Sequence, residues 1–256
     1  MPFTLSHAAA VLPLHRLSRA RLPLAALMIG SMAPDFLYFL PYQPRWLQSH
    51  SLAGLFYFCW PLGLAVWLVF VRVLEQPTLA LLPDSWRGAF PPDDGELDLR
   101  VLMTVSLALL LGALTHILWD AFTHPSPLTV NWPVLRTPLF EFEGRTRRLW
   151  WLLQHLSTLL GAAVLLVWAL RRRDAPRDPA SAAQPRVSPG TRNVAVALII
   201  AGVVILAAAG YLAHPHTRLE RRLFHMAVGG MTGGALAWLA VALWVRNRYC
   251  TATAGV

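Results

Sequence analysis

Long apolar stretches separated by shorter polar ones dominate the pattern of this chain. Five ranges are almost uninterrupted runs of apolar residues: 51–74, 99–122, 149–170, 193–213 and 223–245. Each is about as long as the roughly 20 residues that a helix needs to cross the hydrocarbon core of a bilayer. The pattern therefore predicts an all-α fold, a polytopic transmembrane helical bundle.

Two shorter apolar stretches, 5–15 and 22–33, lie near the N-terminus on either side of an arginine-rich turn at 16–21. A helical arm of about 11 or 12 residues rises only about 17 Å, little more than half of the hydrocarbon thickness. We therefore expect an N-terminal helical hairpin that enters the membrane without crossing it. This geometry returns Asp35 to the level of His7.

The polar stretches predict how the chain is divided. Residues 75–98 and 125–148 are rich in proline and contain acidic residues, so we expect long loops there. Residues 171–192 mix arginine with Pro, Ala, Ser and Asp, a composition typical of a disordered linker. The expected domains are a membrane-embedded domain (1–170), this linker, and a C-terminal transmembrane hairpin and tail (193–256). The bundle then has the N-terminal hairpin, about four full spans, and two C-terminal spans after the linker.

Composition agrees with a membrane protein. Of 256 residues, 56% are hydrophobic and 14% are charged, fewer charges than a soluble domain usually carries. The net charge is +9, and every basic residue is arginine. These arginines flank the apolar ranges, as topology signals do, so we expect no nucleic-acid partner. The two cysteines, Cys59 and Cys250, predict neither a disulfide nor a metal motif.

Arginine counts also predict an orientation. The linker contains six arginines, so it is expected on the cytoplasmic side. Counting back through the spans places His50, His116 and His155 toward the extracytoplasmic side. We therefore expect a multi-pass protein of the inner (cytoplasmic) membrane, with its polar residues gathered at the outer face.

The strongest candidate chemistry lies at the end of the 99–122 range. His116, Asp120 and His124 are spaced four residues apart, so a helix projects all three from one side. Ionisable groups at membrane depth are costly and usually functional. Imidazole and carboxylate are ligands for zinc and related divalent ions. The helix rotates by about 80° between His116 and His124, which makes His124 the least secure ligand.

Other polar residues are expected at the same level. The N-terminal hairpin contributes His7 and Asp35, and His50 precedes the 51–74 span. Three or four of these six residues would hold one divalent metal, zinc foremost, with manganese or iron as alternatives. The full set would suit two metals about 3.5–4 Å apart. The predicted metal-site domain is therefore 1–170.

Catalytic roles are assigned to three residues. Asp35 or Asp120 would orient a ligand or act as general base, and His155 would support the site or a substrate anion. Glu141 and Glu143 would cap the site from their loop. Simpler interpretations remain for other residues: Asp35 could cap a helix. Interfacial rings are expected at His15, His214, His216 and His225.

Several motifs carry a resemblance to a known family. They are Met1–Leu14, Ile29–Phe36, Ser49–Ser51, Thr115–Pro125 and Gln154-His155. In this order they resemble the bacterial membrane family called domain of unknown function 4184, over residues 1–170. The resemblance implies a location in the bacterial inner membrane.

That family is in turn similar to the membrane-bound metal-dependent hydrolase (YdjM-like) family. The hydrolases share an early Thr/Ser-His, a Leu-Gly-Ser-x-x-Pro-Asp element, a His-Ser span start and a His-x-x-x-Asp helix. By this resemblance the ligands are His7, Asp35, His50, His116 and Asp120. A more distant similarity is to zinc-dependent phospholipases C, which act on phosphoesters.

The resemblance and the residue pattern together predict a membrane-embedded metal-dependent hydrolase. It would act on a lipid or lipid-linked phosphoester through a metal-bound hydroxide, with membrane lipids as its partners. A non-enzymatic metal-binding protein or a transporter is the alternative. A transporter is expected to distribute polar groups across the whole membrane depth. A third interpretation is a haem held between His116 and His155.

Overall fold

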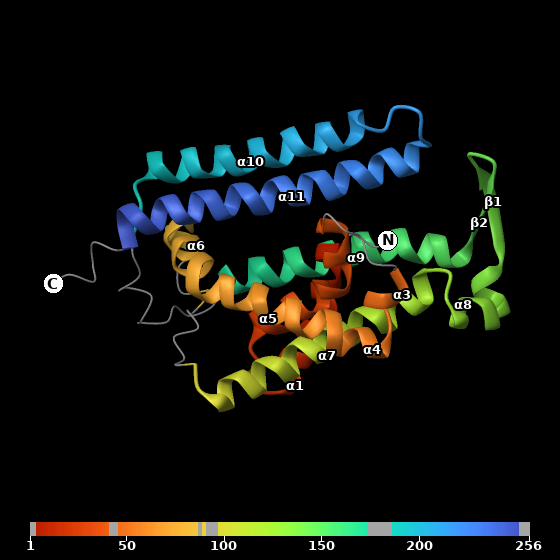
Figure 1. Ribbon diagram of the computed structural model, residues 1–256, viewed down its shortest axis with the longest axis horizontal. Coiled ribbons are helices and arrows are strands. Elements are labelled where there is room, and N and C mark those ends of the chain that lie inside the picture. The colour runs from red at the N-terminus through yellow and green to blue at the C-terminus, as the bar shows by residue number, and fades with distance from the viewer. Residues whose placement is uncertain (1–3, 41–45, 87–88, 91–96, 174–185, 251–256) are drawn as a thin grey trace. The chain divides into compact units, whose positions relative to one another are not determined.

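Helices make up nearly all of the described structure. The computed structural model describes residues 4–40, 46–86, 89–90, 97–173 and 186–250 (Figure 1). Five of its helices are long and apolar enough to cross a membrane: 52–81, 99–123, 149–173, 189–212 and 219–249. Each of them contains most of one of the five apolar ranges of the sequence. The all-α, polytopic fold class is thereby confirmed.

Contacts divide the chain into two compact units, Met1–Trp67 with Gly95–Leu170, and Leu68–Asp94 with Arg171–Val256. In chain order, unit 1 contains η1 (Thr4–Val11), α1 (Leu12–Leu17), α2 (Leu24–Met32), η2 (Ala33–Phe39), α3 (Trp46–Ser49), α4 (Leu52–Gly54), a π-helical turn (Leu55–Cys59), most of α5 (Trp60–Val69), α7 (Leu99–Thr123), α8 (Pro127–Asn131), a 3₁₀ turn (Pro133–Arg136), β1 (Pro138–Phe142), β2 (Arg145–Arg148) and α9 (Leu149–Arg173). Unit 2 contains a π-helical turn (Phe70–Leu74), α6 (Glu75–Leu81), a 3₁₀ turn (Asp84–Trp86), α10 (Pro189–Leu212), α11 (Leu219–Val245) and a final π-helical turn (Arg246–Cys250).

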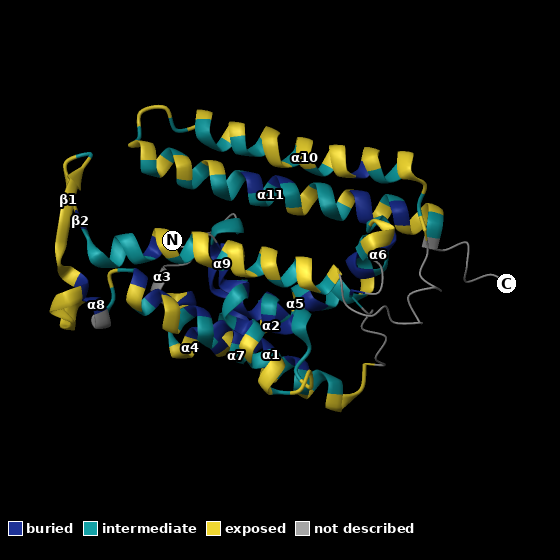
Figure 2. Ribbon diagram, turned by 180° about the vertical axis from the view of Figure 1, so that it is seen from behind, coloured by how far each residue is buried: buried dark blue, intermediate teal, exposed yellow. Residues whose placement is uncertain are grey.

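The core of unit 1 is a close crossing of α2 and α7. A Cβ atom on Gly30 would overlap the backbone of Leu109, and one on Gly112 would overlap the Leu27 carbonyl and the Ser31 amide. The two backbones therefore touch, which only glycine permits at these positions. Figure 2 shows the buried residues of this region gathered on α2 and α7. The crossing fixes the position of α2 along the axis of α7.

The N-terminal hairpin follows the expected plan. η1 and α1 form its first arm, and α2 and η2 form its second. Arg19 and Ala20 take positive φ values of 51° and 60° in the turn between them. The longest apolar helical stretch of the hairpin, Leu24–Phe39, is shorter than the spanning helices. α2 packs on η1, and both segments also contact α7, so the two arms lie beside α7.

Side-chain caps from Ser51, Asp98 and Ser188 begin three of the long helices. The Ser51 hydroxyl accepts a bond from Gly54 N at 3.0 Å, and the Asp98 carboxylate accepts one from Val101 N at 2.7 Å. Each cap satisfies one of the amide groups that a helix start leaves without a partner. The Ser51 cap sets the point at which the first long helix starts, directly after His50.

The predicted loop at 125–148 contains more structure than expected. β1 and β2 form an antiparallel hairpin there, and α8 precedes it. Glu143 and Gly144 take positive φ values of 51° and 68°, as the two central residues of a tight hairpin turn require. The Glu-Gly pair, rather than the apolar pattern, was the signal for this turn. The hairpin is the only sheet among the described residues.

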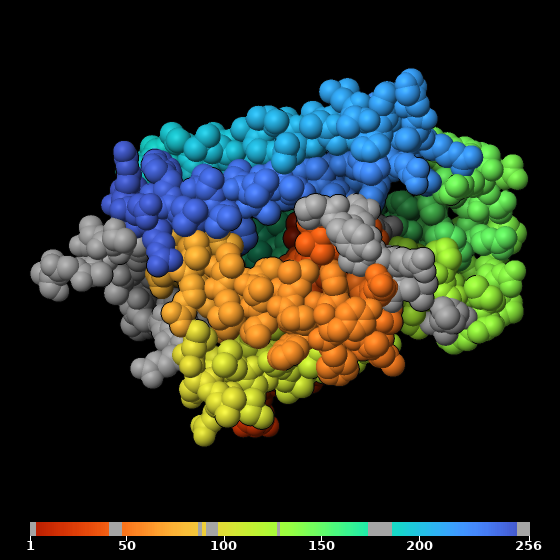
Figure 3. All heavy atoms as spheres, in the orientation of Figure 1, coloured from red at the N-terminus to blue at the C-terminus, as the bar shows by residue number. Residues whose placement is uncertain are grey.

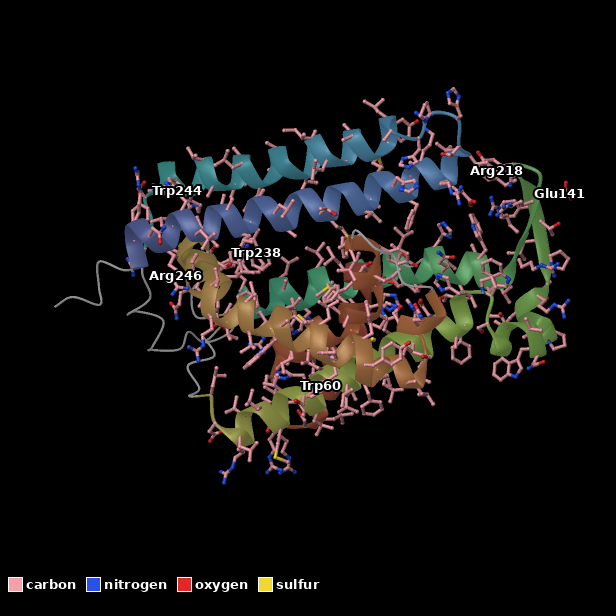
Figure 4. The ribbon with its side chains drawn as sticks, in the orientation of Figure 1. Trp60, Glu141, Arg218, Trp238, Trp244 and Arg246 are labelled. Carbon is pink, nitrogen blue, oxygen red and sulfur yellow. The ribbon has the colours of Figure 1, made fainter. Side chains whose placement is uncertain are left out.

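Unit 2 groups residues 68–94 with the C-terminal hairpin. Trp238 Nε1 of α11 donates to Thr78 Oγ1 at 2.8 Å, and Ala80 packs with Val241 and Val245. Trp238 and Trp244 are labelled on α11 in Figure 4. The helix expected to end at 74 therefore continues to Leu81, because its last turns are buried against α11.

The C-terminal spans form a tightly packed pair. α10 and α11 approach through glycines on both helices, and their side chains merge into one layer in the space-filling view (Figure 3). α10 begins at Pro189 and α11 at Leu219, each earlier than expected, and α9 continues past its expected end to Arg173. The rest of the predicted linker, 174–185, lies outside the described residues.

A Gly112→Ala substitution tests the α2–α7 crossing. Because the added methyl group would overlap backbone atoms of α2, we expect the free energy of unfolding to fall by about 1–3 kcal/mol. Unfolding in detergent measures the change. Gly190→Ala is the matched control, since its Cβ would meet only Ser188 Oγ at 3.8 Å. Equal stability of the Gly112→Ala and Gly190→Ala proteins would contradict the crossing.

Candidate metal centre

The last turns of α7 provide the two central residues of the candidate site. His116 and Asp120 are 0% and 2% exposed, and His116 Nε2 lies 3.4 Å from Asp120 Oδ2. The four-residue spacing places the two side chains one above the other, as the sequence predicted. The residues of α7 buried before them, from Val105 to Ala113, are apolar or glycine. The polar cluster is therefore confined to one end of this helix.

Two other segments bring His50 and Asp35 to the same place. Asp120 Oδ2 lies 3.5 Å from His50 Nε2, and Asp35 Oδ1 lies 3.6 Å from the same nitrogen. Asp35 Oδ1 also lies 3.7 Å from His116 Nε2. Two carboxylate oxygens and two imidazole nitrogens thus alternate around a closed ring of four contacts.

His7 and His124 lie on the other side of Asp120. Asp120 Oδ1 is 3.5 Å from His7 Nε2 and 3.4 Å from His124 Nδ1. The His7 ring is stacked on the His116 ring, with centroids 3.8 Å apart. His124 caps the end of α7 in an extended conformation and its side chain is 13% exposed. The backbone turns at this residue, which returns its ring to Asp120 despite the helical rotation.

The side chains of His116 and Asp35 are each held from behind by a hydrogen bond. His116 Nδ1 lies 2.7 Å from the carbonyl oxygen of Ser31. A carbonyl only accepts, so Nδ1 must carry the proton and Nε2 of the neutral ring must present its lone pair to the cluster. The Thr4 hydroxyl donates to Asp35 Oδ2 at 2.7 Å, which leaves Oδ1 toward the ring of contacts. These supports orient metal ligands in known sites.

The spacing of the inward atoms fits metal ligands better than hydrogen bonds. Contacts of 3.4–3.7 Å are longer than the roughly 2.7–3.2 Å of a hydrogen bond. Two ligands bound about 2.0–2.1 Å from one tetrahedral ion lie about 3.4 Å apart. Four buried atoms of the cluster have no hydrogen-bond partner within the described part of the chain: His7 Nε2, Asp35 Oδ1, His116 Nε2 and Asp120 Oδ1. Such orphaned polar atoms are costly unless something else binds them.

Two groups of three residues have ligand atoms close enough to share an ion. One is His7, Asp35 and His116, and the other is His50, His116 and Asp120, with all atoms within 4.8 Å in each group. The groups share His116, whose single free lone pair binds one ion. The residues present therefore fit one divalent metal with alternative ligand sets more directly than two.

Burial and charge set the ionisation of the hairpin residues. Burial, aided by the nearby His116 ring, lowers the pKa of His7 to about 3, so its ring is neutral. Burial alone would raise the pKa of Asp35, but the His116 and His50 rings outweigh it and hold that pKa below its usual value. A neutral imidazole and an ionised carboxylate are the forms that bind a metal.

Three predicted residues lie elsewhere. His155 is exposed on α9, where its Nδ1 contacts the Trp151 carbonyl oxygen at 2.8 Å and its ring packs on Trp151. Glu141 is exposed on β1 (Figure 4), and Glu143 lies in the hairpin turn. None of these three belongs to a group of described residues whose ligand atoms lie close enough to share an ion. The face of α9 that carries His155 is set by packing, which the spacing of residues did not reveal.

His15, His214 and His225 make local contacts away from the cluster. His15 Nδ1 lies 2.9 Å from the Leu22 carbonyl oxygen, and His214 stacks on His225 with ring centroids 3.6 Å apart. Asp35 makes no capping bond to its own helix, so its helix-cap interpretation is wrong. Neither metal-capable group of the described residues includes His15, His214, His216 or His225.

Sequence reasoning missed the supporting residues. Thr4, the Ser31 carbonyl and Ser49, whose hydroxyl lies 2.8 Å from His50 Nδ1, all hold ligands in place. Burial and the negative charges of the neighbouring Asp35 and Asp120 raise the pKa of the Tyr38 phenol. The adjacent Ser49-His50 pair was visible in the sequence. The Thr4–Asp35 and Ser31–His116 pairs depend on the fold.

A Thr4→Val substitution tests the support of Asp35. Without the hydroxyl, Asp35 Oδ1 loses its fixed direction, and we expect the affinity for Zn²⁺ to fall by about 10-fold or more. Competition with a chelator on the detergent-purified protein measures this affinity. Thr104→Val is the control, because the Thr104 hydroxyl donates only to the Arg100 carbonyl at 2.8 Å. Unchanged affinity in Thr4→Val would contradict this role.

Comparisons with known proteins identify the family but no activity. Neither the curated proteins nor the solved structures contain a match to the chain. The similarity to metal-dependent hydrolases therefore stays a prediction. A family profile, in contrast, matches residues 1–243, which include the whole cluster. The chain belongs to the family described as Domain of unknown function (DUF4184).

Proposed function

We propose that this protein is a membrane-embedded, metal-dependent hydrolase of a lipid or lipid-linked phosphoester. The observation that carries the proposal is the buried ring of Asp35, His50, His116 and Asp120, with its oxygen and nitrogen atoms spaced as ligands. Three of these four residues would hold one divalent ion, zinc foremost, because mixed imidazole and carboxylate ligands suit it and a tetrahedral ion then keeps one position open.

Charge balance supports a divalent ion in this place. Asp35 and Asp120 are 1% and 2% exposed, and buried carboxylates need compensation. With neutral imidazoles, the form that binds a metal, the two carboxylates give the site a formal charge of about −2, which one divalent ion neutralises.

The chain's own residues would divide the work of hydrolysis. A divalent ion with an open position lowers the pKa of a bound water toward 7 and polarises a phosphoryl oxygen. Asp120 would hold the ion through Oδ2 and accept a proton at Oδ1, which faces His7 and His124. His124 has the most exposed side chain of the cluster, at 13%, and its Nδ1 would accept that proton from Asp120. The buried hairpin would exclude bulk water from Asp35.

The buried face of α7 favours an enzyme over a transporter. A transport path needs polar groups through the membrane, yet the residues of α7 buried before His116 are apolar or glycine. A non-enzymatic metal-binding role remains the second candidate, because the same ligands would serve it. The two differ in whether substrate is turned over.

Metal analysis of purified variants tests the site. We expect about one divalent ion per chain in the wild-type protein, and its loss in His116→Ala and Asp120→Ala. His225→Ala is the matched control, since this histidine lies in α11 of unit 2 and should leave the metal content unchanged. Equal metal content in wild type, His116→Ala and Asp120→Ala would contradict the site.

Turnover then separates the two candidate functions. Wild-type protein loaded with Zn²⁺ should release product from phosphatidyl or lipid diphosphate substrates, and Asp120→Ala should lose at least about 100-fold in rate. A loaded wild-type protein that hydrolyses neither substrate would favour the non-enzymatic metal-binding role.

We also propose that the site faces the extracytoplasmic side of the inner membrane. The arginines that end α9, at 171–173, support a cytoplasmic position for that end. In a Cys250→Ser background, a cysteine replacing exposed Glu141 should react with an impermeant maleimide added to intact spheroplasts. A cysteine replacing Arg100, at the start of α7, should react only after lysis. The reverse pattern would contradict the orientation.

A further inference from the structure

A cavity of about 310 Å³ lies beside the metal centre in unit 1. Its walls come from the first arm of the N-terminal hairpin, from Trp119 of α7, and from one side of α9. His7 belongs both to this cavity and to the candidate metal centre. The cavity therefore adjoins the buried polar cluster at His7.

The walls of the cavity offer almost only apolar contact. Besides His7 they contain Ala10, Pro13, Leu160 and Val164. Its two serines are both committed, since Ser6 Oγ donates to the Thr158 carbonyl at 3.0 Å and Ser157 Oγ donates to the Gln154 carbonyl at 2.9 Å. Ordered water needs two to four polar partners, so this space favours a hydrocarbon occupant.

The position of the cavity along α9 also favours hydrocarbon. Its α9 residues run from Ser157 to Val164, about 10 Å along the helix and around the middle of the span Leu149–Arg173. The middle of a spanning helix lies in the hydrocarbon core of the bilayer. Leu160 and Val164 are 66% and 48% exposed, so the cavity opens sideways. A lipid chain can enter through that side.

The size of the cavity limits what it can hold. About 310 Å³ is at the lower end of the roughly 300–1,000 Å³ range of ligand pockets. One hydrocarbon chain fits such a space, whereas a whole two-chain lipid does not. Beside the cavity, α9 packs closely on the first arm of the hairpin, because a Cβ atom on Gly161 would overlap the backbone of Ser6.

We propose that this cavity binds one hydrocarbon chain of the lipid whose ester or phosphoester reaches the metal centre at His7. The proposal rests on the proposed function in so far as that lipid is the substrate. An acyl chain and an isoprenoid chain share the chemistry that the walls recognise. The headgroup end of the chain would lie at His7, and the remainder would lie along α9.

Photolabelling with lipids tests the occupant. One probe is a phosphatidyl lipid with a diazirine on one acyl chain, and a second is an isoprenyl phosphate with a diazirine on its chain. We expect at least one probe to label residues in the 157–164 segment, located by mass spectrometry. Labelling by the acyl probe alone supports a glycerolipid, and labelling by the isoprenyl probe alone supports a lipid carrier. Labelling of this segment by neither probe would overturn the proposal.

A matched pair of valines provides the control. Val164 and Val167 are each 48% exposed on α9, but only Val164 lines the cavity. Val164→Phe should reduce labelling of the segment at least about fivefold, and Val167→Phe should leave it unchanged, with equal metal content in both. Equal labelling of the two variants would overturn the proposal.

The experiments can reject the proposed hydrolysis and the proposed chain site independently of each other. Asp120→Ala should still be labelled in the 157–164 segment, because the cavity walls do not include Asp120. Labelling without turnover in the loaded wild-type protein would support the chain site while rejecting the hydrolase. If Val164→Phe changed neither the turnover nor the labelling of the segment, the chain site alone would be rejected.

Discussion

The contact between α2 and α7 determines the rest of the candidate site. Gly30 and Gly112 let the two backbones touch, and one turn beyond Gly112 the Ser31 carbonyl meets His116 Nδ1 at 2.7 Å. That bond fixes the tautomer of His116. It also fixes the height of η2, which continues from α2 and carries Asp35. A backbone contact between two helices thereby orients both a nitrogen and an oxygen ligand.

The cluster combines features that are costly separately. Two carboxylates and three imidazoles lie buried in an apolar bundle, where each would be expensive alone. Their alternation places Asp35 Oδ1 and both oxygens of Asp120 beside nitrogens rather than beside another carboxylate. Hydrogen bonds from behind satisfy the outer atoms of Asp35, His50 and His116, whose inner atoms face a common centre. This division between satisfied outer atoms and orphaned inner ones distinguishes a binding site from a structural polar network.

Much of the candidate site could be predicted from the sequence alone. The His116–Asp120 pair needed only helical periodicity, and His7, Asp35 and His50 needed only a shared depth in the membrane. Residues whose roles depend on packing could not be found this way. His155 has a similar position along its span but faces away, and Thr4 supports Asp35 across 31 positions of the chain. The Glu143-Gly144 turn was legible, but a search for apolar runs overlooks it.

The order in which the ligands occur along the chain has a consequence for biogenesis. His7 and Asp35 leave the ribosome roughly a hundred residues before Asp120, an interval of about 5–20 s at ordinary rates of synthesis. During that interval the hairpin has no α7 to pack on, and Asp35 has neither His116 nor the completed ring to offset its burial. The nascent hairpin must therefore wait near the headgroups, where water solvates the carboxylate, and reaches its final depth only when α7 arrives.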